Sequence, residues 1–409
     1  MCGAAIASGR LYAVEVMVSQ PIHLTPARRL AALPPLALYV HIPWCLRKCP
    51  YCDFNSHESR GAAPEARYVD ALVADLEAAL PLVWGRRVYS VFFGGGTPSL
   101  FSAVSIGRIL DAVRARLSLD AEVEITLEAN PGTFELEKFR GFRDAGVNRL
   151  SIGVQSFQSE ALRALGRVHD ADEARAAVEG ALRWFDRVNV DLMYGLPGQT
   201  AAQAASDVST ALALGIRHVS AYHLTLEPNT WFHRYPPKLP DEEATAQIEQ
   251  AVHARLLEGG LQQYEVSAFA LPGQRARHNL NYWTFGDYLG IGAGAHGKLS
   301  LPDRILRQVR HRQPQRYLEA ALAGDAVFEQ HEVADADLPF EFMLNALRLL
   351  EGVPVALFAE RTGLPLSRIV PALERAEARG LLARDHLHLQ PTALGMQFHN
   401  DLVQLFLND

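Results

Sequence analysis

The sequence has little cysteine, no excess of basic charge and no long apolar run. Only four of its 409 residues are cysteines, which excludes a small domain held together by several disulfides. With a formal net charge of −7, bulk charge would not draw the chain to nucleic acid or to an anionic membrane surface. No apolar stretch approaches the roughly 20 residues that a membrane-spanning helix needs. Hydrophobic residues still make up 49% of the chain, which excludes disorder throughout.

Residues 1–35 are expected to form a leader outside the folded domains. The leader contains Cys2, and Glu15 interrupts its only apolar stretch. No cleavage site of a secretion signal follows, so we expect a cytoplasmic protein. Because 409 residues exceed one ordinary compact domain, we expect two domains, at 36–305 and 306–409.

The first expected domain alternates short β-branched or aromatic runs with longer amphipathic stretches. Six strands are predicted, at Leu36–Ile42, Val88–Phe93, Glu122–Glu128, Arg149–Val154, Arg187–Met193 and His218–Leu224. Helices are predicted at Tyr68–Leu80, Ser105–Leu117, Leu136–Asp144, Ala171–Arg183 and Ala201–Leu214. Repeated βα units imply a parallel sheet with right-handed crossovers. We therefore predict an α/β fold, a partial (β/α)6 barrel, with its active groups at the carboxyl ends of the strands.

The second expected domain is mostly helical. Phe340–Leu350 is predicted to be an amphipathic helix, and Pro354–Thr362 with Pro365–Arg379 reads as a helix–turn–helix pair. Leu381–Leu389 suits a two-stranded wing. Acidic residues outnumber arginines in this region, which disfavours DNA binding by the winged-helix-like domain. A lid or docking surface over the barrel mouth is the favoured interpretation.

Three cysteines are clustered directly after the first predicted strand. Cys45, Cys49 and Cys52 form the pattern CxxxCxxC. Three thiolates can hold three corners of a 4Fe-4S cluster and leave the fourth iron open. The alternative is a structural zinc site with His41 or His57 as the fourth ligand. The cluster is favoured, because structural zinc loops more often carry paired CxxC motifs.

The residues around these cysteines resemble the radical S-adenosylmethionine (SAM) superfamily. Residues 39–45 read YVHIPWC and residues 50–57 read PYCDFNSH. Both resemble the branch that contains the oxygen-independent coproporphyrinogen III dehydrogenase HemN and the haem chaperone HemW. The resemblance extends from about Leu36 to the C-terminus. It implies a radical SAM barrel in which the open iron of the cluster chelates the amino and carboxylate groups of SAM.

Glycines and polar residues stand at the ends of the next strands. Gly95 and Gly96 belong to a glycine triplet that would let the backbone approach a ligand closely. Carboxylate and amide side chains close the third, fourth and fifth strands. By resemblance, the SAM contacts of the family fall on Tyr39, Gly96, Thr97, Glu128, Gln155, Arg167 and Asp191. Tyr51 matches a position near a second SAM molecule of the dehydrogenase, and the presence of Arg167 leaves a second SAM site open.

Two features separate this sequence from the dehydrogenase. The dehydrogenase carries a fourth cysteine, CxxxCxxCxC, where this chain has Phe54, and its long N-terminal arm is largely missing here. The segments HNLNYW at 278–283 and GIGAGAHG at 290–297 fit the chaperone side of the branch instead.

Two histidines in those segments are candidates for ligand contacts. His278 could be an axial ligand of haem iron, with Tyr282 and Trp283 stacked on the macrocycle. The alternative places His278 in the pocket wall as a hydrogen-bonding residue and the two aromatic residues in the core. His296 has glycine neighbours and is expected to border SAM.

The resemblance implies a haem chaperone that binds haem as cargo and delivers it to haem-acceptor proteins. Respiratory haemoproteins, membrane-associated ones among them, are the expected acceptors, and nucleic acid is not an expected partner. The alternative functions are the coproporphyrinogen III dehydrogenase of porphyrin biosynthesis and another radical SAM enzyme. The machinery for SAM chemistry is implied, but Phe54 and the HNLNYW segment make coproporphyrinogen decarboxylation an unexpected activity.

Overall fold

The computed structural model describes residues 30–59, 61–132 and 137–407. Its main element is a twelve-stranded sheet in the order β14-β13-β12-β11-β1-β4-β5-β6-β7-β8-β10-β9. The central six strands are parallel neighbours in chain order: β1 (Leu36–Ile42), β4 (Arg87–Gly95), β5 (Ser118–Ala129), β6 (Arg149–Gln155), β7 (Val188–Tyr194) and β8 (His218–His223). These strands confirm the predicted partial (β/α)6 barrel.

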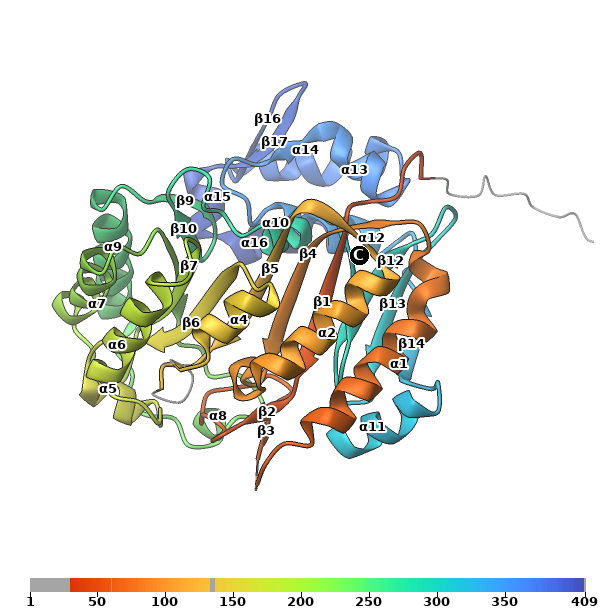
Figure 1. The fold of residues 1–409 in the computed structure, drawn as a ribbon. Helices are drawn as coiled ribbons and strands as arrows, with labels where there is room; N and C mark the ends of the chain where they lie inside the picture. Colours follow the sequence, from red (N-terminus) through yellow and green to blue (C-terminus); the bar gives the residue numbers. More distant parts are fainter. Residues whose placement is uncertain (1–29, 60, 133–136, 408–409) are drawn as a thin grey trace, which may run out of the picture.

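Helices cover the outer face of the parallel strands (Figure 1). They are α1 (Glu65–Val83), α2 (Ala103–Arg116), α4 (Phe139–Ala145), α5 (Ser159–Ala164), α6 (Ala171–Leu182) and α7 (Ala201–Ala213), with a 3-10 turn at Pro98–Leu100. Sequence signals begin two of them. The side chain of Asp170 accepts the backbone N–H of Glu173 at the start of α6, and Thr200 and Gln203 form the same capping box at α7.

The strands are nearly continuous apolar runs because both of their faces are buried. Leu38, Phe93 and Ile152 are fully buried in the main hydrophobic core, together with Tyr68 of α1 and Ile109 of α2. Burial of one such side chain contributes roughly 1.5–3 kcal/mol. The core therefore holds the carboxyl ends of the parallel strands, and the residues that follow them, in a common rigid frame.

The sheet continues beyond β1 on its other edge. There, β11 (Asp287–Ile291) runs parallel to β1, and β12 (His296–Ser300), β13 (Ile305–Arg310) and β14 (Val327–Glu332) follow as antiparallel strands. Between β13 and β14, α11 (Pro314–Leu322) packs against α1. The expected domain boundary at residue 306 falls inside β13. We propose the boundary after β14, because backbone pairing joins residues 306–332 to the main sheet.

The opposite edge of the sheet is closed by β9 (Gln262–Glu265) and β10 (Ala268–Ala270), which are antiparallel to each other and, through β10, to β8. The helices α8 (Trp231–Arg234), α9 (Glu242–Glu258) and α10 (Arg277–Trp283) lie in this part of the chain. Two short parallel strands, β2 (Trp44–Cys45) and β3 (His57–Glu58), frame the cysteine loop. No helix in the part of the chain that the structure describes is long and apolar enough to cross a membrane.

The C-terminal region has a hydrophobic core of its own. Its helices are α12 (Leu338–Ala346), α13 (Val355–Thr362), α14 (Val370–Ala378), α15 (Ala393–Gln397) and α16 (His399–Gln404), with a 3-10 turn at Leu366–Arg368. The predicted helix–turn–helix is present, and Gly363 ends α13 with a left-handed φ of 71°. The wing has three strands, β15 (Val353–Pro354), β17 (His388–Pro391) and β16 (Leu382–Arg384), because β15 pairs with β17.

The position of this domain differs from the expected lid. In Figure 1 the domain lies at the end of the sheet where the parallel strands begin, whereas β2 and β3 lie at the end where they finish. Its core includes Phe285, which precedes β11, and Ile305, the first residue of β13. These apolar contacts attach the domain to the amino ends of the strands. The lid interpretation was therefore wrong.

Candidate functional site

The three loop cysteines lie at the carboxyl end of the barrel strands, as predicted. Cys45 ends β2, and the backbone N–H of Cys52 donates to the Cys49 carbonyl at 3.1 Å, which folds the loop into a turn. All three thiols are partly buried and free of disulfides. They line a small cavity of about 140 Å³, hereafter the cysteine cavity.

Each cysteine sulfur has a polar neighbour within hydrogen-bonding distance. The Thr97 hydroxyl lies 3.6 Å from Cys45 Sγ, the Arg167 guanidinium 3.5 Å from Cys49 Sγ, and a serine hydroxyl 3.6 Å from Cys52 Sγ. Burial raises the pKa of Cys45 and of Cys52. Donors aimed at sulfur and a cationic guanidinium favour thiolates despite that burial. The donor set therefore fits an iron–sulfur cluster.

Arg167 is held in place by further hydrogen bonds. Its Nη2 donates to Asn130 Oδ1 and to the Gly153 carbonyl, both at 2.7 Å. Asn130 in turn donates to the Thr97 hydroxyl at 2.8 Å. Sequence reasoning did not select Asn130, although its place two residues after the third strand's terminal carboxylate was the available signal. It links the groups that contact two of the three sulfurs.

His41 is not available as the fourth ligand of the alternative zinc site. Its Nδ1 is 2.9 Å from the Tyr39 hydroxyl and its Nε2 is 2.9 Å from the Asn55 carbonyl, so both ring nitrogens are already paired. Burial lowers the His41 pKa to about 4. Across residues 30–59, 61–132 and 137–407, no three His, Cys, Asp or Glu side chains are gathered where one metal ion could be held.

The glycines at the carboxyl end of β4, Gly95 and Gly96, bring backbone against the cysteine loop. Gly95 has a φ of 114°, and a Cβ at this residue would lie 2.5 Å from the His41 ring. A Cβ on Gly96 would lie 2.5 Å from the Trp44 carbonyl oxygen. A side chain at either position would displace its neighbours, so the close approach requires glycine.

Two half-buried carboxyl groups, Glu128 and Asp191, face the cysteine cavity. Burial and the nearby Asp191 raise the pKa of Glu128 to about 8, and burial also raises the pKa of Asp191. Glu128 accepts the Gly95 N–H at 3.2 Å, while Asp191 accepts hydrogen bonds from Ser151 and Asn189 at 3.2 and 2.8 Å. An ammonium or sulfonium group in the cavity would stabilise both ionised forms. The site therefore has the electrostatics of a cation-binding pocket.

The structure brings most of the predicted cofactor residues to this cavity. Those that line it are Cys45, Cys49, Tyr51, Cys52, Gly95, Gly96, Thr97, Glu128, Gln155, Arg167 and Asp191. Tyr39 and His296 line a neighbouring, larger cavity instead.

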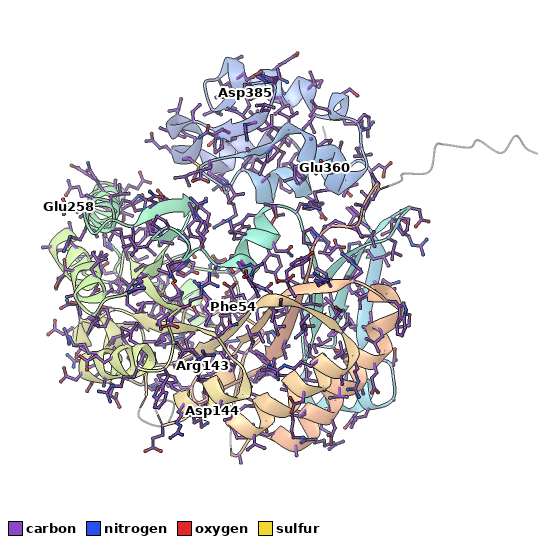
Figure 2. The ribbon with its side chains drawn as sticks, turned by 45° about the horizontal axis from the view of Figure 1, so that its top comes forward. Phe54, Arg143, Asp144, Glu258, Glu360 and Asp385 are labelled. Carbon is purple, nitrogen blue, oxygen red and sulfur yellow. The ribbon has the colours of Figure 1, made fainter. Side chains whose placement is uncertain are left out.

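The larger cavity has a volume of about 730 Å³, within the range of cavities that hold an organic cofactor or ligand. It shares Cys52, Phe54, Gly95 and Glu128 with the cysteine cavity. Phe54, labelled near the centre of Figure 2, is 63% exposed at this junction. A ligand in the larger cavity would therefore lie directly beside Cys52 and next to the cysteine cavity.

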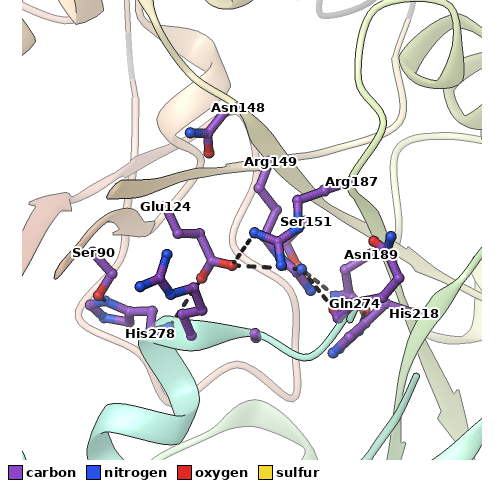
Figure 3. A network of polar contacts seen from close by, with 12 residues as sticks. Ser90, Glu124, Asn148, Arg149, Ser151, Arg187, Asn189, His218, Gln274 and His278 are labelled. Atoms are coloured by element: carbon purple, nitrogen blue, oxygen red, sulfur yellow. Dashed lines mark hydrogen bonds and ion pairs between the residues drawn. The ribbon is translucent and has the colours of Figure 1, made fainter. Parts of the chain in front are cut away.

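His278 lies within the wall of the barrel. It is 2% exposed; its Nδ1 is 2.9 Å from the Ser90 hydroxyl, and its Nε2 is 3.2 Å from the Tyr282 hydroxyl. Glu124 accepts its backbone N–H at 3.1 Å and anchors α10 to a buried polar network (Figure 3). Burial lowers the His278 pKa to about 3. This geometry agrees with the alternative in which His278 is a hydrogen-bonding residue of the pocket wall, because both of its ring nitrogens already have hydrogen-bond partners.

The two other aromatic residues of the HNLNYW segment, Tyr282 and Trp283, lie in different surroundings. Tyr282 lines the larger cavity. Trp283 packs against the C-terminal core, with the Arg348 guanidinium 4.3 Å from its ring centre. Only one of the two side chains is therefore placed to stack on a ligand. His296, expected to border SAM, lies outside the lining of the cysteine cavity, at the first position of β12.

Comparisons with known proteins agree with this geometry. The radical SAM superfamily model matches residues 39–209, and the HemN C-terminal domain model matches residues 333–398. The heme chaperone HemW of Escherichia coli is 49% identical over 383 residues, covering 92% of this chain and 100% of that protein. HemW of Haemophilus influenzae is 46% identical over 92% of this chain and 99% of its own length.

A solved structure shares nearly the whole fold. Coproporphyrinogen III oxidase (HemN) from Escherichia coli, described as a radical SAM enzyme, has a TM-score of 0.77 and 25% identity, covering 91% of this chain and 90% of that chain. The match at 49% identity extends over the whole length of its relative, and the cysteine loop stands at the carboxyl end of a parallel (β/α)6 sheet. The chain belongs to the HemW family of radical SAM proteins.

Proposed function

We propose that this protein is a haem chaperone, which binds haem beside a SAM-coordinated 4Fe-4S cluster and passes it to haemoproteins. The observation that carries the proposal is the 730 Å³ cavity that opens beside the cysteine cavity, with Phe54 at the junction. Two relatives whose alignments cover 92% of this chain are named heme chaperones. Cytoplasmic loading and delivery to acceptors that include membrane-associated haemoproteins complete the proposal.

The cysteine cavity would hold the cluster and SAM. Cys45, Cys49 and Cys52 would ligate three irons of the cluster, and the cluster would supply a coordination position and redox chemistry for SAM. The backbone around Gly95 lets a ligand approach closely, and Glu128 would accept hydrogen bonds from it. These residues would bind and orient SAM without taking part in a proton transfer.

The larger cavity suits a macrocycle better than it suits decarboxylation. Phe54 presents an apolar ring where the dehydrogenase pattern has a fourth cysteine. Tyr282 and Tyr288 add aromatic surface, and Lys48 and Arg312 add positive charge for carboxylates. The cavity can therefore bury the faces of a tetrapyrrole and pair its acidic groups.

The test uses a single anaerobically reconstituted, cluster-loaded sample. Haem is titrated and followed by its Soret band, and the loaded protein is then mixed with an apo-haemoprotein. Coproporphyrinogen III with SAM and a reductant is incubated in parallel. We expect saturable haem binding in the micromolar range or tighter, transfer to the acceptor, and no decarboxylation. Turnover to protoporphyrinogen IX without saturable haem binding would replace this proposal with the dehydrogenase.

A further inference from the structure

A second hollow, of about 500 Å³, lies on the three antiparallel strands β12, β13 and β14. The residues that line it include Arg307, Phe328, His331 and Glu341. It also shares two residues, His296 and Arg312, with the larger cavity described above. The larger cavity and this second hollow therefore meet at the His296 imidazole and the Arg312 guanidinium.

Strand register brings His296, Arg307 and His331, which line this second hollow, to one face of the sheet. His296 pairs with Val309, which pairs with Glu329 on the next strand. Two residues away, Arg307 pairs with His331. Residues opposite each other on neighbouring strands point to the same face, and so do residues two apart on one strand. The sheet therefore places two histidines and an arginine side by side.

His296 differs from His278 in accessibility. His296 is exposed at the junction of the two hollows. Partial burial and the positive charges of Arg312 and Arg307 lower its pKa, so the ring is neutral near pH 7. A neutral, accessible imidazole is a ligand for haem iron. By contrast, the ring of His278 would first have to break its hydrogen bonds with Ser90 and Tyr282.

The arginine side chains near His296 are suited to pair with the carboxylate side chains of haem. Arg312 is exposed on the turn after β13. Arg307 lies deeper, where it donates to the Tyr288 hydroxyl and to Glu341, both at 2.6 Å. Arginine pairs with carboxylates through two parallel N–H donors. A macrocycle in the larger cavity, which Phe54 and Tyr282 both line, would extend its carboxylates towards the exposed Arg312 guanidinium.

We propose that His296 is the protein ligand of the haem iron and that Arg312 pairs with a haem carboxylate at the mouth of the second hollow. This proposal rests on the proposed function, since it assigns the residues that hold the cargo. Its ligand class is an iron tetrapyrrole with carboxylate side chains. Iron coordination requires the metal, whereas the arginine contact requires only the carboxylates, and this difference makes the two roles separable.

The experiment compares ferric haem with metal-free protoporphyrin IX on the full-length, cluster-loaded protein. His296→Ala should shift the Soret band and weaken haem binding by about tenfold or more, while protoporphyrin IX binding stays within about twofold of wild type. Imidazole added to this variant should restore the band. Arg312→Ala should weaken both ligands alike. The matched control is His386→Ala, which removes an exposed histidine of the C-terminal wing and should change neither.

The outcomes separate this inference from the proposed function. Wild-type protein that binds no haem would overturn both. Haem binding by His296→Ala with the wild-type band and affinity would overturn only the His296 assignment. A Soret shift caused by His278→Ala but not by His296→Ala would assign the iron-ligand role to His278 instead. If His296→Ala lost its cluster, His296→Gln would replace it, with the retained SAM-dependent EPR change of the cluster as the test of an intact fold.

Discussion

The ionisation of Glu128 provides a direct test of the cysteine cavity. Burial and Asp191 raise its pKa from the usual 4.5 to about 8, so the folded chain holds this proton more tightly than the unfolded chain. The stabilisation from that proton is complete below pH 4.5, and it is lost as the pH rises through about 8. The contribution of Glu128 by itself should therefore lower the free energy of unfolding across this pH window.

The magnitude follows from the difference between the two pKa values. One pKa unit corresponds to 1.36 kcal/mol, so Glu128 can lower the free energy of unfolding by at most about 5 kcal/mol between pH 4.5 and 8. Glu128→Gln cannot ionise, and its amide oxygen can still accept the Gly95 N–H. The free energy of unfolding of the variant should fall less steeply with pH, by up to that amount over the window.

The assay is urea unfolding of the metal-free, SAM-free chain at a series of pH values from 5 to 8.5, with a reductant present. Glu122→Gln is the matched control, because Glu122 lies on the same strand but is exposed; its profile should run parallel to that of wild type. If wild type and Glu128→Gln also gave parallel profiles, the assignment of a strongly raised pKa to Glu128 would be refuted.

Three further predictions concern the cluster and its surroundings. Alanine at any one of the three loop cysteines should abolish a stable 4Fe-4S spectrum after reconstitution, whereas Cys2→Ala, outside the described residues, should leave four iron atoms bound; zinc in place of iron would contradict this. Gly96→Ala should weaken SAM binding by about 1–3 kcal/mol in anaerobic titrations, because its Cβ would meet the Trp44 carbonyl oxygen, and unchanged affinity would contradict the close approach. Arg167→Met should lower the cluster's reduction potential by on the order of tens of millivolts in an EPR redox titration, because a positive charge and the contact with Cys49 Sγ are removed; an unchanged potential would place the guanidinium outside the cluster's field.

Part of the fold could be read from local patterns alone. The six parallel strands were predictable because strands covered on both faces need continuous apolar runs. The strands β13 and β14 were not predicted, although Ile305–Arg310 alternates buried and half-buried positions over most of its length. Val327–Glu332 is mostly exposed, so hydrophobicity carried little signal for an edge strand. Its place in the sheet depends on backbone pairing with β13, which composition does not encode.

The sequence by itself determined the chemistry of the cysteine cavity. The three cysteines lie within one short loop, and Gly95, Glu128, Gln155 and Asp191 lie at or near the carboxyl ends of strands that had to reach the same edge of a parallel sheet. Such positions depend on local spacing and on one topological rule.

Only the tertiary structure decided where the histidines and the C-terminal domain lie. His278 and His296 both stand in motifs of the same branch, but α10 packs one into the wall, while β12 presents the other at the junction of two cavities. The C-terminal domain lies at the amino ends of the strands, because its apolar core continues into Phe285 and Ile305. These placements result from packing between segments far apart in the sequence, and local patterns carry no information about which surfaces will meet.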